Sequence, residues 1–196
     1  MQKDIAFFDF DGTITTKDSM LEFTKYTHGL IKYFFGMCLL LPWLIGMKIN
    51  IVSRTKGKER FISYFFKHTS ILKFNADCLF FTEKILPRFI KKNALFEINK
   101  HKKNNVQVVV VSASAENWVA PWCVQNDLLF ICTKLKIEHG EITGSLLGQN
   151  CNGSEKVNRI KAVFDTADYK NIYCYGDSYG DTEMLELATH RYYRML

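Results

Sequence analysis

Short apolar runs, each ending in a polar or glycine-containing turn, recur along the chain. Residues 4–10 lead into Asp-Gly, and residues 171–176 lead into Gly-Asp. Residues 106–112 form a nearly unbroken row of β-branched side chains, and residues 128–133 form another apolar run. Runs of this length and composition predict strands buried on both faces.

Segments with helical spacing separate these predicted strands. They cover residues 94–103, 115–126, 154–164 and 180–188. Strands that alternate with helices predict a parallel sheet with helices on both faces, which is a three-layer, Rossmann-like α/β core. Residues 134–147 predict a small hairpin around His139 and Gly140.

The connection between the first two predicted strands is far too long for a simple crossover. Its pattern is mostly helical, notably over residues 56–67 and 76–91. We therefore predict two parts, an α/β catalytic core of residues 1–16 plus 89–196 and an inserted all-helical cap of residues 17–88.

The predicted cap carries the positive charge of the protein. Residues 17–88 contain 12 Lys or Arg and 5 Asp or Glu, a net charge of +7, whereas the whole chain has +6. Such a segment attracts phosphates, nucleic acid or anionic lipid. Its positive residues are interleaved with apolar residues and not with base-stacking motifs, so nucleic acid is not an expected partner.

An uncharged stretch, Tyr33 to Met47, lies inside the cap. As a helix it would reach about 22 Å, whereas a membrane span needs about 20 residues, and Gly36, Pro42 and Gly46 interrupt it. We therefore predict no transmembrane helix. Two interpretations stay open. The stretch is either a buried hairpin in the cap, or an apolar surface that lies against a bilayer or covers a hydrophobic substrate. Trp43 and the basic residues that follow favour the surface.

The six cysteines include no Cys-x-x-Cys pair, which gives no support for a zinc site. The chain begins with a charged residue and a strand, without the pattern of a secretory signal. Scattered cysteines in such a chain are typical of small buried side chains in a reducing compartment. We expect a cytoplasmic protein, with peripheral membrane contact if the cap surface is apolar.

Four carboxylates follow two of the predicted strands. Asp9 and Asp11 are two residues apart, so on an extended chain they point the same way. Asp177 and Asp181 come after residues 171–176, at the same edge of a parallel sheet. Clustered carboxylates repel and need a compensating cation, for which Mg²⁺ fits an all-oxygen ligand set. Asp181 alone is equally typical of a helix N-terminus.

Two further positions predict an anion site. Ser112 ends the second strand, and it and the amide of Ala113 precede a helix, where free N–H groups bind anions. Lys156 lies just inside another predicted helix, where a cation opposes the helix dipole. Taken singly, Ser112 is also typical of a helix N-cap and Lys156 of a solvated side chain.

The order of these motifs is more specific than any one of them. Asp9 to Thr13, then Ser112, then Lys156, then Gly176 to Asp181 resembles the haloacid dehalogenase superfamily over essentially the whole chain. The long helical insert after the first motif is similar to the cap of the phosphoserine-phosphatase-like branch. The resemblance implies a Mg²⁺-dependent phosphatase that forms an aspartyl phosphate.

The resemblance also implies a role for each motif residue. Asp9 would be the nucleophile, and Asp11 the acid and then the base. The implied Mg²⁺ ligands are Asp9, the Asp11 carbonyl and Asp177. The implied phosphoryl ligands are Ser112, the Ala113 amide and Lys156, with Asp181 supporting the metal or Lys156.

The substrate is less defined. Phosphoserine phosphatases have a glutamate nine residues after the nucleophile, whereas this chain has Asp18, and Ser178 and Gly180 also depart from their pattern. These departures disfavour phosphoserine. An apolar cap with basic flanks is similar to bacterial phosphatidylglycerophosphate phosphatases of the branch. The expected partner is a phosphorylated small molecule or a phospholipid head group; a phosphotransferase or phosphomutase stays open.

Overall fold

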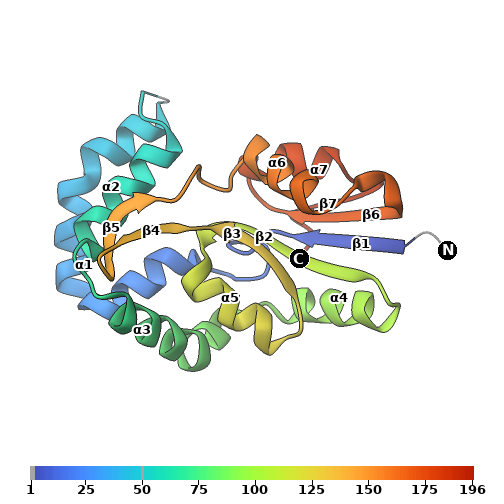
Figure 1. The fold of residues 1–196 in the computed structure, drawn as a ribbon, viewed down its shortest axis with the longest axis horizontal. Coiled ribbons are helices and arrows are strands. Elements are labelled where there is room, and N and C mark those ends of the chain that lie inside the picture. Colours follow the sequence, from blue (N-terminus) through green and yellow to red (C-terminus); the bar gives the residue numbers. More distant parts are fainter. Residues whose placement is uncertain (1–2, 50) are drawn as a thin grey trace.

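A computed structural model describes residues 3–49 and 51–196 (Figure 1). Its centre is a five-stranded sheet in the order β3-β2-β1-β6-β7, and every neighbouring pair is parallel. The strands are β1 (Lys3–Phe8), β2 (Gln107–Ala115), β3 (Leu129–Thr133), β6 (Tyr169–Gly176) and β7 (His190–Tyr193). The four strands expected from the apolar runs are confirmed. The fifth, β7, was not predicted, because its sequence His-Arg-Tyr-Tyr is short and largely exposed at an edge.

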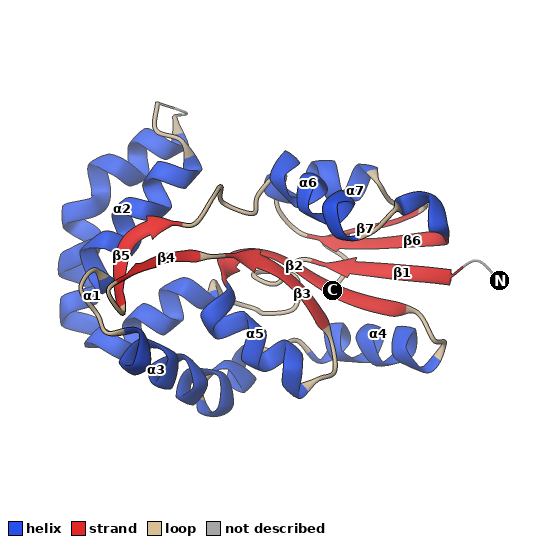
Figure 2. Ribbon diagram, in the orientation of Figure 1, coloured by secondary structure: helices blue, strands red, loops and turns tan. Residues whose placement is uncertain are grey.

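Side chains of β1 alternate between two hydrophobic clusters, as a strand buried on both faces requires. Ala6 and Phe8 belong to one cluster, and Ile5 and Phe7 belong to the other. Helices α4 (Lys92–Lys103) and α5 (Glu116–Gln125) cover one face, and α6 (Ser154–Val163) and α7 (Thr182–Glu186) cover the other (Figure 2). The predicted three-layer α/β core is confirmed.

Three helices lie beyond one end of the sheet and form the cap (Figure 1). They are α1 (Ser19–Lys48), α2 (Arg54–Phe66) and α3 (Ile71–Lys84), followed by a 3-10 turn, Leu86–Phe89. The hairpin of β4 (Leu135–Glu138) and β5 (Glu141–Leu146) also lies here, and its Ile142 exchanges backbone hydrogen bonds with His68 and Thr69. A segment assigned to the core thus packs on the cap, and the boundaries at 16/17 and 88/89 stay predictions.

Helix α1 runs through the uncharged stretch. Its backbone turns at Gly29, with φ 74° and ψ 166°, and it continues as a helix to Lys48. A Cβ at Gly36 would lie 2.4 Å from the Phe65 ring, so this glycine allows α1 and α2 to pack closely and makes no turn. The buried-hairpin interpretation is therefore wrong. By length and a mean hydropathy of 1.7, α1 alone among the described helices could cross a membrane, and 22% of that window is buried.

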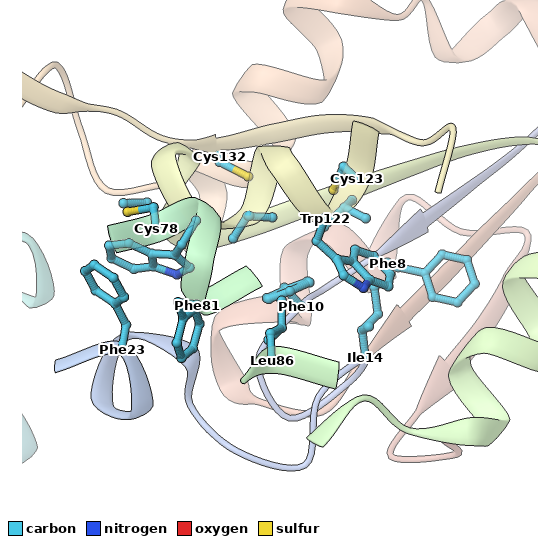
Figure 3. Close-up of a cluster of buried hydrophobic side chains, with 14 of the residues drawn as sticks. Phe8, Phe10, Ile14, Phe23, Cys78, Phe81, Leu86, Trp122, Cys123 and Cys132 are labelled. Carbon is cyan, nitrogen blue, oxygen red and sulfur yellow. The ribbon is translucent and has the colours of Figure 1, made fainter. Parts of the chain in front are cut away.

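Aromatic side chains join the cap to the core (Figure 3). Phe23 of α1 stacks on Trp118 of α5 with ring centroids 5.3 Å apart, and Phe81 of α3 meets Phe23 edge-on at 5.4 Å. The Trp118 indole N–H donates to Ser19 Oγ over 3.0 Å. The first turn of the cap is therefore fixed directly against the core.

Candidate active site

The carboxyl ends of three neighbouring strands bring the predicted residues together. Asp9 follows β1, Ser112 lies near the end of β2, and Asp177 follows β6. Because β1 lies between β2 and β6 in the sheet, their loops meet at one edge. Asp9 N–H donates to the carbonyl of Tyr175 over 2.9 Å, which extends the strand pairing up to the site.

Lys156 is the centre of this cluster. Only 1% of its side chain is exposed, so the solvated-lysine interpretation is wrong. Its Nζ donates to Asp9 Oδ1 over 2.5 Å, to Asp181 Oδ1 over 2.6 Å and to the Val111 carbonyl over 2.8 Å. These three bonds use all three ammonium protons. Burial by itself would lower the pKa of Lys156, but the carboxylates of Asp9 and Asp181 outweigh it and raise that pKa, so the ammonium stays charged.

Among the buried carboxylates, Asp9 is the one whose negative charge is least offset by neighbouring groups. Burial raises its pKa to about 7, Asp181 and Asp11 act in the same direction, and Lys156 opposes them. Within residues 3–49 and 51–196 its carboxylate accepts one hydrogen bond, from Lys156. Its second oxygen is therefore available as a metal ligand or a nucleophile.

Asp181 supports the others and has no free oxygen. Its Oδ1 accepts from Lys156, and its Oδ2 accepts from the N–H and Oγ of Ser178 over 3.0 and 2.8 Å. Burial raises its pKa, but Lys156 and Ser178 together lower it, so Asp181 stays ionised. Its geometry fits the positioning role that the resemblance implies.

The residues present fit a hard divalent cation. Carboxylate oxygens of Asp9, Asp177 and Asp181 lie within 4.8 Å of one another. Asp177 also accepts from Thr13 Oγ1 over 3.1 Å, and a Cβ at Gly12 would lie 2.2 Å from Asp177 Oδ2. Glycine at position 12, with φ 83°, therefore lets the two loops approach closely enough to share an ion.

The Asp11 carboxylate points away from this metal cluster and toward the cap. It accepts from Ser114 Oγ over 2.5 Å and from Ser19 N–H over 2.7 Å. Burial, followed by the charge of Asp18, raises its pKa to about 6, whereas the hydrogen bonds of Ser114 and Ser19 lower it. This orientation leaves only the Asp11 carbonyl for the metal and its carboxyl group for proton transfer.

Ser112 is not a helix N-cap. It lies within β2, α5 begins at Glu116, and Ser112 Oγ accepts from Ser114 N–H over 2.9 Å. The next residue, Ala113, lies beside the cap, because its carbonyl accepts from Lys58 Nζ of α2 over 2.7 Å. The end of β2 thus contacts the cap through the Ala113 carbonyl.

Asp18 is the N-cap of α1, where its side chain accepts from Leu21 N–H over 3.0 Å. It also lies at a cavity of about 460 Å³ between cap and core. The apolar lining comes mainly from the cap: Met20, Leu21, Met37, Leu44, Met47 and Phe61. Polar and cationic side chains around the cavity include Lys48, Arg54, Lys58, Asn150 and Asn152.

Sequence reasoning missed Lys58, Ser19 and Ser114. Burial lowers the pKa of Lys58, while Asp18 and Asp11 raise it, so the ammonium lies in the field of both carboxylates. The only signal for Lys58 was its place in the basic run after residue 53. Ser19 and Ser114 are 95 residues apart, and their Oγ atoms are 3.1 Å apart. No local pattern marks such a contact.

Comparison with known proteins gives matches over nearly the whole chain. The family model for haloacid dehalogenase-like hydrolases matches residues 6–186. Protein CicA of Caulobacter vibrioides is 36% identical over 191 residues, covering 96% of this chain and 84% of CicA. Probable phosphatase Rv3661 of Mycobacterium tuberculosis is 28% identical, covering 94% of this chain and 66% of that protein.

A solved structure has the same fold. A substrate-bound phosphoserine phosphatase matches with a TM-score of 0.67 and 18% identity, covering 98% of this chain and 86% of that one. At this identity the likeness shows the fold alone.

Proposed function

Because this chain belongs to the haloacid dehalogenase-like hydrolases, we propose that it is a magnesium-dependent phosphatase that cleaves phosphomonoesters through an aspartyl phosphate on Asp9. The observation that carries the proposal is the buried Lys156, which contacts Asp9 and Asp181 next to Asp177. The relative named probable phosphatase Rv3661 supports the same class of reaction.

In the proposed first step, the free carboxylate oxygen of Asp9 attacks phosphorus, the ester P–O bond breaks, and Asp11 gives its proton to the leaving alkoxide. In the second step, Asp11 takes a proton from water, the water oxygen attacks phosphorus, and the bond to Asp9 breaks to release phosphate. A pKa of about 6, raised mainly by burial, suits a group that is acid and then base near neutrality.

The remaining residues stabilise charge. Mg²⁺ held by Asp9, Asp177 and the Asp11 carbonyl would offset the negative charge of the phosphoryl oxygens. Ser112 and the Ala113 amide would donate to those oxygens. Lys156 supplies a positive charge and orients Asp9, and a phosphoryl oxygen would replace one of its three present acceptors.

The first experiment measures phosphate release from soluble phosphomonoesters with Mg²⁺ or with EDTA. Wild type should release phosphate only with Mg²⁺, and Asp9→Asn should lose turnover while keeping its circular dichroism spectrum. Asp127→Asn is the matched control, because that carboxylate is 90% exposed and lies outside the site. Wild-type turnover by Asp9→Asn would refute the nucleophile. Release only after a second phosphate acceptor is added would favour a phosphotransferase or phosphomutase.

For the substrate, the cavity lining favours an amphiphilic phosphate, such as a phospholipid head group, over a wholly polar metabolite. Methionine and leucine side chains of the cap surround the cavity. Lys58 of α2 also lines it and reaches the core at the Ala113 carbonyl. Flexible methionines accommodate irregular apolar groups. We place this activity in the cytoplasm, which agrees with free cysteines at all six positions.

Two substrate sets separate the alternatives. One set contains phosphoserine and sugar phosphates, and the other contains phosphatidylglycerophosphate and phosphatidic acid in detergent micelles. Met37→Gln and Met47→Gln should raise KM for the micellar set and leave KM for soluble esters nearly unchanged. Preference of wild type for a soluble ester would make the substrate a small metabolite and leave the catalytic proposal intact.

A further inference from the structure

The outer face of α1 is unusual for a water-exposed helix. We define it by Leu30, Ile31, Phe34, Phe35, Leu39 and Ile45, whose exposed fractions range from 51% to 90%. No charged residue occurs between Lys32 and Lys48. A contiguous apolar surface of this kind marks an interaction site, whereas scattered exposed apolar residues do not.

The opposite side of the same helix is already used for packing. Tyr33, Gly36 and Leu40 are buried, at the spacing of one helical face, and Gly36 lies against Phe65 of α2. The uncharged stretch of α1, Tyr33 to Met47, is therefore apolar around its circumference but covered on one side only. Helices that are apolar all round lie in protein interiors or in lipid.

We propose that the outer face of α1 binds the surface of an anionic lipid bilayer, with the helix axis in the plane of the interface. Insertion across the bilayer does not fit the fold. It would draw α2, with Lys56, Glu59 and Arg60, into hydrocarbon, or separate the two helices and expose their packed faces. Binding in the plane keeps the packed side intact and buries only the outer face.

Charge favours lipid over the other occupants. The cap segment, residues 17–88, has a net charge of +7, and Lys32, Lys48 and Lys56 are exposed near the ends of the apolar face. A second copy of this chain would bring an equal positive charge to the contact, whereas anionic head groups attract it. Trp43 adds an interfacial side chain, with the Arg60 guanidinium 4.9 Å from its ring centroid.

The bound orientation would bring the cavity to the lipid. Leu44, Met47 and Lys48 line the cavity between cap and core, and they form the last turn of the helix that carries the outer face. An amphiphile could then reach the site without leaving the interface. Vesicle binding is independent of the proposed chemistry, so Asp9→Asn should bind vesicles as wild type does.

The test is cosedimentation with vesicles of phosphatidylcholine alone or with one third phosphatidylglycerol. The wild-type protein should bind the anionic vesicles and dissociate from them as the salt concentration is raised. Ile31→Gln/Phe35→Gln/Leu39→Gln removes apolar surface without adding charge, and it should lower the partition coefficient at least about tenfold. Lys32→Gln/Lys56→Gln should weaken binding to anionic vesicles and hardly alter binding to neutral ones.

The matched control is Phe96→Gln/Val124→Gln/Val163→Gln, on core helices α4, α5 and α6, where the exposed fractions are 66%, 65% and 64%. It should bind as wild type does. An equal loss of vesicle binding in both triple variants, or no vesicle binding by the wild type, would overturn the proposal. So would a concentration-dependent dimer without lipid that the α1 variant abolishes, because the outer face would then join two copies.

Tryptophan fluorescence gives a second readout. Trp118 and Trp122 are 1% and 5% exposed, whereas Trp43 is 38% exposed on the helix that carries the outer face. Brominated lipid should quench the wild type, and Trp43→Phe should remove that quenching. Binding without any quenching of Trp43 would place the membrane contact elsewhere and refute the proposed face.

Discussion

The cluster around Lys156 and the outer face of α1 depart in opposite ways from the usual distribution of side chains, in which apolar groups are buried and charged groups are exposed. Around Lys156, three charged side chains are buried, and the lysine donates to both carboxylates, Asp9 and Asp181. On α1, large apolar side chains face water. Folding alone favours neither arrangement. We interpret the first region as built for chemistry and the second as built for contact, because each departs from the common pattern of burial.

Among the substitutions that test this contrast, Lys156→Met should have the largest effect. It leaves Asp9 and Asp181 buried without their cation, which should cost about 3–5 kcal/mol of folding free energy and most of the activity. Urea unfolding with EDTA and phosphate release measure both. Burial already raises the pKa of Asp9, so the unpaired carboxylate binds protons more tightly in the folded chain. The variant should therefore be more stable at pH 5 than at pH 8. A loss that does not depend on pH would contradict this account.

A second prediction contrasts two phenylalanines of α1. Phe23 is fully buried against Trp118 and Phe81, so Phe23→Ala should lower the free energy of unfolding by about 3–5 kcal/mol. Phe35 is 62% exposed, and Phe35→Ala should change it by less than about 0.5 kcal/mol. Thermal and urea unfolding without lipid test the pair. A large loss for Phe35→Ala would mean that this face is covered in solution.

A third prediction concerns Lys58, which lies where the cap meets the core. Lys58→Gln removes a cation that donates to the Ala113 carbonyl and lies near Asp18 and Asp11. We expect KM to rise about tenfold, or roughly 1.4 kcal/mol, with kcat changed less. Lys67→Gln, an exposed position at the end of α2, is the control. A fall in kcat alone would place Lys58 in the chemical step and not in substrate binding.

The elements that the sequence predicted share a simple physical origin. Strands β1 and β2 are mostly buried and β3 and β6 are partly buried, but all four are rich in apolar side chains. Each is therefore recognisable as an apolar run, and the motif carboxylates follow two of those runs. The edge strand β7 is largely exposed and carries no such run. Local pattern is informative where a strand consists mainly of apolar side chains, as the partly exposed edge strand β3 also does.

Other features depend on contacts that no local pattern encodes. In the sequence Lys156 resembles a solvated lysine in a helix, and only its contacts with Asp9, 147 residues away, and Asp181, 25 residues away, show why it is buried. Gly36 and Gly46 favoured a turn in the sequence, but they serve packing, with Phe65 and Val52 close to where a Cβ would stand. The sequence alone does not distinguish a glycine that forms a turn from one that allows close packing, because the difference depends on which residues pack against it.

The bond from Ser19 N–H to Asp11 ties the reactive groups to the first turn of the cap. The proposed nucleophile Asp9 and its partner Lys156 belong to the core, whereas the proposed proton donor Asp11 is oriented by a residue on α1. Cap and core are therefore not interchangeable modules. A chimera that takes its cap from a relative would have to keep a backbone N–H where Ser19 now donates, or the grafted protein would keep its proposed nucleophile and lose the alignment of its proposed acid.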